Sequence, residues 1–236
     1  WALGQTDSNL SAPQPIYSKS AIHNGPYNLG LNTPTIGIAL DAAGHRLFLS
    51  DTTNNRILVY NLDSGNVLLD RIPDSVLGQP NFHSNTAGAT QTGLETPNGL
   101  AMSGSTLLFV AEGAGSRVKV FDVAAITNGE NAVNVLGQLT FVGTAAATTQ
   151  GGMSAPSDVV YDSVNQRLFV ADPTLNRVTT YNLAFITDGE NAVNVLGQAN
   201  FTTATAATTQ TGMNVPYGLA YDSANQRLFV SEGTSN

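Results

Sequence analysis

The sequence predicts an all-β fold, a β-propeller of four-stranded antiparallel blades, of which the 236 residues cover about four. Three observations lead to this prediction. A unit of about sixty residues recurs nearly four times along the chain. Each unit holds four short runs rich in β-branched and aromatic residues, bounded by turn-forming residues and without helical periodicity between them. Several runs are apolar on both faces, which is typical of sheets covered on both sides.

The repeat is defined by four landmarks. They are Val-Leu-Gly-Gln at 76–79, 135–138 and 195–198, with Ala-Leu-Gly-Gln at 2–5; a core phenylalanine at Phe48, Phe109, Phe169 and Phe229; a hairpin arginine at Arg56, Arg117 and Arg177; and a leading proline at Pro34, Pro97, Pro156 and Pro216. Successive core phenylalanines are 61, 60 and 60 residues apart. The segments 128–138 and 188–198 differ at one position only, so the repeat is not a chance similarity.

The third unit illustrates the strands that we expect in every unit. They are strand A at Asp158 to Asp162, strand B at Arg167 to Asp172, strand C at Arg177 to Leu183 and strand D at Ala192 to Gln198. The run Leu168-Phe169-Val170-Ala171 is apolar on both faces, as expected when blades stack face to face around an axis. The leading prolines suit the first residue of a strand, where no N–H group is needed for the ladder.

The whole chain is predicted to be one partial propeller. Its expected parts are a closing D strand at 1–5, an atypical insertion at 6–33, blade 1 at 34–79, blade 2 at 97–138, blade 3 at 156–198 and half of blade 4 at 216–236. Because the last unit stops before its strand C, we expect an incomplete ring, with further blades needed to close it.

Composition excludes several classes of function. The net charge is −8 with nine Lys and Arg residues, which argues against a phosphate-binding face and therefore against nucleic acid. The absence of cysteine excludes disulfides and thiolate metal sites. No apolar run is long enough to span a membrane. Only 11% of residues are charged, and a surface of uncharged polar groups favours a secreted or cell-surface protein.

Three segments carry a family resemblance. They are Pro-Tyr-Gly-Leu-Ala-Tyr-Asp at 216–222, Arg-Leu-Phe-Val at 227–230 and Asp-x-x-x-Asn-Arg at 172–177. Together they resemble the NHL repeat, in a variant with a longer unit. The resemblance implies a six-bladed ring. It leaves the activity open, because six-bladed relatives include lactonases and lyases with a metal at the central channel.

The recurring charges have a regular spacing. Carboxylate and arginine stand five residues apart across the B–C hairpins, in Asp51–Arg56, Glu112–Arg117 and Asp172–Arg177, and across the A–B hairpins, in Asp41–Arg46, Asp162–Arg167 and Asp222–Arg227. Residues at this spacing lie opposite each other on antiparallel strands. We therefore expect structural ion pairs at the surface, each contributing about 0–1 kcal/mol.

The alternative reading is a ring of carboxylates that binds a divalent cation, one from each blade. Its members would be Asp51, Glu112, Asp172 and Glu232. A carboxylate that is paired with arginine is a poor ligand, so we expect no metal, no cofactor and no catalytic residue. Glu232 is the exception without an arginine five residues on. The histidines, His23, His45 and His83, occupy no repeated position.

Two functions remain. The first is a non-enzymatic, extracellular or cell-surface scaffold, with a protein or glycan partner on a loop face, or with self-association. The Thr/Ala-rich loops at 142–150 and 202–210 are candidates for that face, because loops on a rigid scaffold commonly bind ligands. The second is a metal-dependent enzyme, similar to a lactonase or lyase, with a site at the central channel. The near-identical blades favour the first, since a catalytic site needs different residues on different blades.

Overall fold

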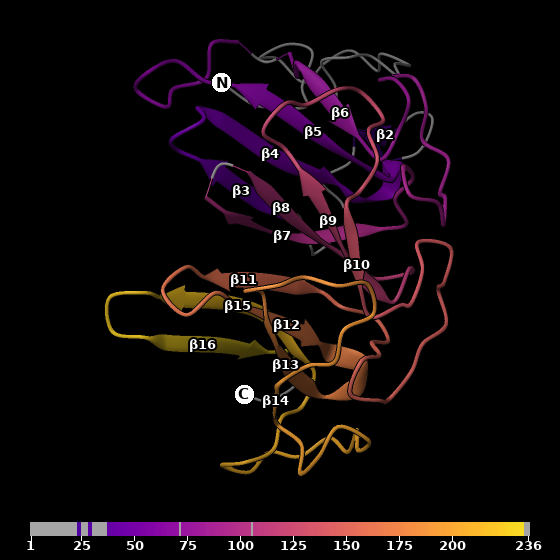
Figure 1. Cartoon of the computed structure of the whole chain (residues 1–236), viewed down its shortest axis with the longest axis vertical. Helices are drawn as coiled ribbons and strands as arrows, with labels where there is room; N and C mark the ends of the chain where they lie inside the picture. The colour runs from indigo at the N-terminus through magenta and orange to yellow at the C-terminus, as the bar shows by residue number, and fades with distance from the viewer. Residues whose placement is uncertain (1–22, 25–27, 30–36, 71, 105, 234–236) are drawn as a thin grey trace.

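The computed structural model describes residues 23–24, 28–29, 37–70, 72–104 and 106–233. Within these residues, three four-stranded antiparallel sheets and one two-stranded sheet stack face to face (Figure 1). This arrangement confirms the predicted all-β fold of propeller-like blades. The expected closing strand at 1–5 and most of the expected insertion at 6–33 lie outside the described residues.

The strands follow one another in the same order in each sheet. The first sheet is β3 (Ile38–Asp41), β4 (Arg46–Asp51), β5 (Arg56–Asn61) and β6 (Ser75–Leu77); the second is β7 (Pro97–Ser103), β8 (Leu107–Glu112), β9 (Arg117–Asp122) and β10 (Asn134–Leu136); the third is β11 (Asp158–Asp162), β12 (Arg167–Asp172), β13 (Arg177–Asn182) and β14 (Asn194–Leu196); the fourth is β15 (Pro216–Asp222) and β16 (Arg227–Glu232). Short elements are β1 (His23–Asn24), β2 (Asn28–Leu29), η1 (Thr52–Asn54) and η2 (Pro173–Leu175). We call the strands of a sheet A to D, so β3, β7, β11 and β15 are the A strands, which lie in the middle of the stack.

The hairpins explain the polar residues at their turns. Each B–C hairpin turns through a residue with a left-handed backbone, Asn55, Ser116 and Asn176, at φ 52°, 49° and 50°. Asparagine tolerates this conformation better than most residues, which accounts for Asn before the hairpin arginine in two of the sheets. The following arginine then begins strand C directly opposite the carboxylate that ends strand B.

The interfaces between sheets join two different faces. The phenylalanine face of one sheet, which carries the strand-B phenylalanine, packs on the opposite face of the next sheet. Phe109 stacks on Tyr161 with ring centroids 5.8 Å apart, and Phe169 lies 5.6 Å from Tyr221. Because a sheet in the middle of the stack is covered by a neighbouring sheet on each face, its strand B is apolar on both sides.

The burial of the strand-B phenylalanines falls along the chain. Phe48 and Phe109 are fully buried at 0% exposure, and Phe169 is half-buried. Phe229, however, is 56% exposed. The predicted core position of Phe229 is therefore wrong, because no described sheet covers the phenylalanine face of β15 and β16.

The nearly identical segments 128–138 and 188–198 connect neighbouring sheets. The Asn128 side chain accepts a hydrogen bond from the Val76 N–H at 3.0 Å, and the Asp188 side chain accepts one from Val135 at 3.0 Å. The following glycines donate to the carbonyl groups of the same two valines. Each C–D loop thus holds strand D of the preceding sheet, which gives this segment a structural reason to repeat closely.

The Leu-Gly-Gln motif after each D strand is also structural. Gly137 has φ 88°, and a Cβ atom there would lie 2.9 Å from the Sδ atom of Met153. Gln138 donates from Nε2 to the carbonyl oxygens of Ser116 and Ala145, at 3.0 and 2.9 Å. The motif therefore joins the B–C hairpin to the D–A loop. Within the described residues, no helix has the length and apolar character needed to cross a membrane.

Candidate functional site

The B–C hairpin pairs of the first two sheets lie in the protein interior. The Nε atom of Arg56 lies 2.8 Å from Oδ2 of Asp51, and Arg117 pairs with Glu112 in the same way. All four side chains are at most 1% exposed. The expectation of surface pairs is therefore wrong for these two. Breaking a buried pair costs about 3–5 kcal/mol, several times the value for an exposed pair.

The third hairpin differs. Asp172 and Arg177 lie opposite each other in the strand register, but they form no ion pair within the described residues. The Asp172 carboxylate instead accepts hydrogen bonds from the backbone N–H groups of Ser154, Ala155 and Leu175. The carboxylate is drawn away from the arginine because it caps both the one-turn helix η2 and the D–A loop.

The hairpin arginines share a different contact. Each donates from Nη1 to the carbonyl oxygen of the phenylalanine that follows strand D in its own sheet. These contacts are Arg56 to Phe82 at 2.7 Å, Arg117 to Phe141 at 2.9 Å and Arg177 to Phe201 at 2.6 Å. The arginines thus anchor the D–A loops, whether or not they pair with the carboxylate.

At the A–B hairpins, one of the three expected pairs forms. Arg46 lies 2.6 Å from Asp41. Asp162 and Asp222 instead accept hydrogen bonds at 2.7 Å from Asn165 and Asn225, which lie within their own turns. An asparagine three residues after the aspartate takes the place of the arginine, and the side chains of Arg167 and Arg227 are exposed.

The second sheet contains a buried lysine that sequence analysis did not single out. Lys119 donates from Nζ to the carbonyl oxygens of Thr90 and Gly93 and lies 3.4 Å from Glu112. Burial raises the pKa of Glu112 to about 7 and lowers the pKa of Lys119 to about 8. The signal was present in the sequence, because strand C holds no lysine at the same place in the other sheets, where Leu58 and Thr179 stand.

In the third sheet, an arginine makes the contacts with the D–A loop that Lys119 makes in the second sheet. Arg177 donates from Nη2 to the carbonyl oxygens of Thr149 and Gly152, at 3.2 and 2.8 Å. These two residues correspond in the repeat to the residues that Lys119 contacts. In both cases a cationic side chain donates hydrogen bonds to the same turn of the preceding D–A loop, so the contacts of Lys119 have a structural explanation.

The proposed metal ring does not assemble in the described residues. Asp51, Glu112 and Asp172 are each bound within their own hairpin or D–A loop. No group of three or more His, Asp or Glu side chains that could hold a metal ion occurs in the described part of the chain. His45 contacts Asn66 at 2.8 Å in its hairpin.

Two cavities lie along the A strands, and one carboxylate lines the second of them. A cavity of about 290 Å³ is lined by apolar and aromatic side chains of the A strands, including Leu40, Met102, Tyr161 and Tyr221. A second hollow of about 400 Å³ is lined by Asp158, which replaces the glycine found at this repeat position elsewhere. Burial raises the pKa of Asp158, which accepts hydrogen bonds from the N–H groups of Leu219 and Val159. Asp158 is thus an inter-sheet contact that sequence analysis missed.

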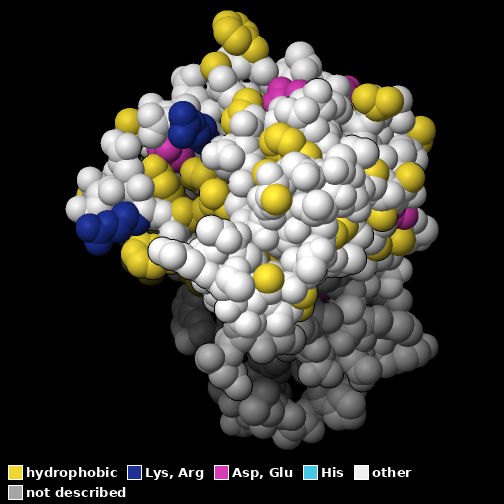
Figure 2. All heavy atoms as spheres, turned by 90° about the horizontal axis from the view of Figure 1, so that it is seen from below, with side chains coloured by type: hydrophobic (Ala, Val, Ile, Leu, Met, Phe, Trp, Pro, Cys, Tyr) yellow, Lys and Arg dark blue, Asp and Glu magenta, His cyan; other side chains and the backbone are white. Residues whose placement is uncertain are grey.

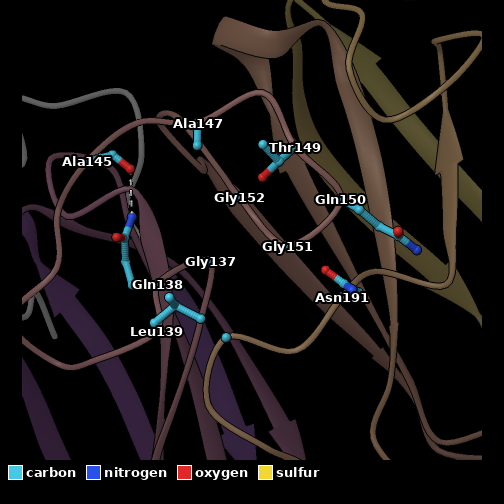
Figure 3. A pocket seen from close by; sticks show the side chains of 11 residues that line it. Gly137, Gln138, Leu139, Ala145, Ala147, Thr149, Gln150, Gly151, Gly152 and Asn191 are labelled. Carbon is cyan, nitrogen blue, oxygen red and sulfur yellow. Dashed lines mark hydrogen bonds between the residues drawn. The ribbon is translucent and has the colours of Figure 1, made fainter.

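A third cavity, of about 460 Å³, lies between the D–A loop after β10 and the C–D loop after β13 (Figure 3). We call it the rim cavity and take it as the candidate site. It is lined by Gly137, Gln138, Leu139, Ala145, Ala147, Thr149, Gln150, Gly151, Gly152, Gly189 and Asn191. In Figure 3, Gln138 and Leu139 lie on one side, and Gln150 and Asn191 lie on the other. None of the lining residues is charged or aromatic.

Glycine and amide groups give the rim cavity its shape. A Cβ atom on Gly152 would lie 2.6 Å from the carbonyl oxygen of Ala147, so the loop can fold this closely only with glycine there. Gln150 donates from Nε2 to the carbonyl oxygen of Ala192 at 2.9 Å. This hydrogen bond connects the D–A loop to the C–D loop on the Gln150 side of the cavity. Leu139 is 80% exposed at the edge of the cavity. The arrangement suits binding of an uncharged polar group and holds no acid, base or nucleophile pair for catalysis.

Comparison with known proteins supports the fold. One solved structure, that of a nidogen/laminin complex, matches with a TM-score of 0.51 and 17% identity over 84% of this chain and 56% of that chain. The fold is that of a β-propeller. Hydrazine synthase of Kuenenia stuttgartiensis matches with a TM-score of 0.54 and 12% identity, over 89% of this chain and 47% of that chain. This chain thus spans about half the length of the propeller-containing chains that it resembles. No protein-family model and no curated protein matches it.

Proposed function

We propose that the chain is a non-enzymatic, NHL-type propeller that acts as a binding or assembly module outside the cell or at its surface. The observation that carries this proposal is the rim cavity, which has an uncharged lining of amides, hydroxyls and backbone groups. The buried carboxylates and arginines, which could have served chemistry, are engaged in hairpins and loop anchors.

The lining favours an extended, neutral segment of a protein partner. Backbone and amide groups can pair with a peptide chain, and Leu139 offers an apolar contact at the edge. Because the lining contains no aromatic ring on which a sugar could stack, a glycan is the second choice.

The metal-dependent lactonase- or lyase-like alternative would need a ligand set near the axis. The described hollows along the A strands offer one carboxylate, Asp158, and it already accepts two backbone hydrogen bonds. The geometry therefore gives this alternative less support than it gives the binding module.

The proposal is tested with labelled protein on arrays of neutral peptides and neutral oligosaccharides. We expect saturable binding to members of the peptide array. Leu139→Glu, which puts a charge at the cavity edge, should weaken that binding about tenfold or more, equivalent to about 1.4 kcal/mol. The matched control is Val142→Glu, a 68% exposed residue of the same loop outside the lining, which should leave affinity unchanged.

Two results would count against the proposal. One is the lack of saturable binding to either array by the folded protein. The other is equal binding by wild type and Leu139→Glu, which would place any ligand elsewhere. Binding to the oligosaccharides alone would keep the module but replace the peptide with a glycan.

A further inference from the structure

Two lining residues of the rim cavity are smaller than their equivalents in the other units. The D–A loop that lines the cavity aligns residue by residue with the D–A loops of the first and third units. The differences are Gly151 where those loops have Thr92 and Thr211, and Ala145 where they have Thr86 and Thr205. The cavity thus lies on the loop in which both threonines are replaced by smaller residues.

The boundary between the first and second sheets is otherwise built in the same way. Gln91 donates from Nε2 to the carbonyl oxygen of Ala132 at 2.8 Å, as Gln150 does to that of Ala192 at 2.9 Å. The two C–D loops share the sequence Gly-Glu-Asn-Ala, which ends on these alanines. The glycine in place of threonine therefore changes a site whose surroundings are repeated elsewhere in the chain.

The missing side chain at Gly151 leaves a space that is bordered by oxygen atoms. A Cβ atom there would lie 2.9 Å from Oδ1 of Asn191, 3.3 Å from the carbonyl oxygen of Gly189 and 3.6 Å from that of Glu190. Figure 3 shows Asn191 beside Gly151 on this side of the cavity. Within the described residues, no N–H or O–H group donates a hydrogen bond to any of these three oxygens. A ligand group in this space therefore needs to be a hydrogen-bond donor.

The chain itself shows which donor suits neighbouring oxygens of a D–A loop. Gln138 donates from Nε2 to the carbonyl oxygens of Ser116 and Ala145, at 3.0 and 2.9 Å. Gln79 and Gln198 make the equivalent pair of hydrogen bonds in the first and third units. In all three units a primary amide, with two N–H groups on one nitrogen, joins two backbone carbonyl groups.

An ammonium group is the other donor that the chain uses, but it has a countercharge. Lys119 donates to two loop carbonyl oxygens and lies 3.4 Å from the Glu112 carboxylate. The rim cavity has no charged lining residue, and the nearby Glu190 carboxylate accepts a hydrogen bond from the Thr187 N–H. Figure 2 likewise shows a face of the molecule on which charged side chains are few. A neutral amide is favoured here, because burying an unpaired charge costs far more than burying a hydrogen-bonded polar group.

We propose that the space beside Gly151 binds a primary amide, the side chain of an asparagine or glutamine in the partner's extended segment. The inference rests on the proposed function, since it names the side chain that the peptide places in the rim cavity. The amide nitrogen donates to Oδ1 of Asn191 and to the carbonyl oxygen of Gly189. Gly151 then determines the specificity, because a larger residue would fill the space with its own side chain.

Neutral peptides that differ at one position test the proposal by their affinities. Peptides with glutamine or asparagine at that position should bind about tenfold more tightly than those with methionine or leucine, which lack the N–H groups. Gly151→Thr should remove this preference, and it should fold normally because threonine stands at the equivalent positions Thr92 and Thr211. The matched control is Ala146→Thr, on an exposed residue of the same loop outside the lining, which should keep the preference.

A small probe separates this inference from peptide binding as a whole. Acetamide, titrated to millimolar concentrations, should shift the NMR signals of Gly151, Gly152 and the Asn191 side chain in wild type and leave them unshifted in Gly151→Thr. N,N-dimethylacetamide, which has no N–H group, should shift none of them. Acetamide binding without any peptide binding would support the amide site while counting against the binding module.

Three results would overturn the inference and leave the binding module standing. One is peptide binding without preference for an amide, together with no effect of acetamide. Another is tighter binding of lysine than of glutamine peptides, which would assign the space to an ammonium group. The third is an amide preference that Gly151→Thr retains, which would place the amide elsewhere on the protein.

Discussion

Replacing Phe109 with alanine is expected to lower the free energy of unfolding by about 3–5 kcal/mol, the range for a large buried aromatic side chain. Phe109 is fully buried and stacks on Tyr161 of the next sheet, so its removal leaves a void in the interface. The measurement is denaturant unfolding at a protein concentration at which the chain is monomeric.

The control is the same substitution two repeat units further along the chain. Phe229→Ala changes the same repeat position, but this side chain is 56% exposed, so the cost should stay below about 1 kcal/mol. If monomeric Phe229→Ala lost as much stability as Phe109→Ala, the face of β15 and β16 would be covered, contrary to the structure.

The second large effect concerns pH. In the folded protein the pKa of Glu112 is raised from 4.5 to about 7, so the folded state binds more protons than the unfolded state between these values. The stability that this group contributes is therefore complete below pH 4.5 and is lost as the pH rises to about 7. The pKa of Lys119 is lowered from 10.5 to about 8, so the unfolded state binds more protons in that interval and stability is regained as the pH rises from about 8 to 10.5.

The double variant Glu112→Gln/Lys119→Met removes both titrating groups. The difference in unfolding free energy between wild type and variant should pass through a minimum near pH 7–8, with a depth on the order of 1–3 kcal/mol. The other charged groups at this cluster, Arg117 and Glu95, are present in both proteins. The measurement is a series of denaturant unfolding curves between pH 5 and pH 10. A difference in unfolding free energy that stays constant over this range would contradict the shifted pKa values of Glu112 and Lys119.

The strands could be predicted from the sequence because the same pattern of apolar and turn-forming residues recurs in every unit. Strands A and B of the third unit begin and end at the expected residues, Asp158–Asp162 and Arg167–Asp172. Strand D is shorter than expected, at Asn194–Leu196, because Gly197 leaves the strand with φ 84° and Gln198 anchors the D–A loop instead.

The contacts of individual side chains were harder to predict, because residues at the same spacing in different units can have different surroundings. The five-residue spacing of carboxylate and arginine recurs, yet Arg56 pairs with Asp51 while Arg177 reaches loop carbonyl groups. In the third unit the Asp172 carboxylate accepts hydrogen bonds from the backbone N–H groups of Ser154, Ala155 and Leu175 instead. Phe229 likewise has the sequence context of a core residue, but its burial depends on a neighbouring sheet, which a local pattern cannot report.

The rim cavity could not be located from the sequence. Its walls come from segments more than fifty residues apart in the sequence, with Gln138 and Leu139 on one side and Asn191 on the other. Most of the glycines and amides that line it also occur in the other units, and the one exception among them is Gly151, which stands where the other units have Thr92 and Thr211. The Thr/Ala-rich loop at 142–150 was predicted as a candidate binding face, and four residues of its sequence line the cavity: Ala145, Ala147, Thr149 and Gln150.

The central claim is that the recurring carboxylates hold the sheets and hairpins together and bind no metal. Calorimetric titration of chelator-stripped protein with calcium tests this most directly, since Asp51, Glu112, Asp172 and Glu232 are the alternative ligands and calcium prefers carboxylate oxygens. We predict heats of dilution only, for wild type and for Asp172→Asn alike. Saturable binding at micromolar strength that Asp172→Asn abolishes would contradict the account and favour the metal-dependent enzyme.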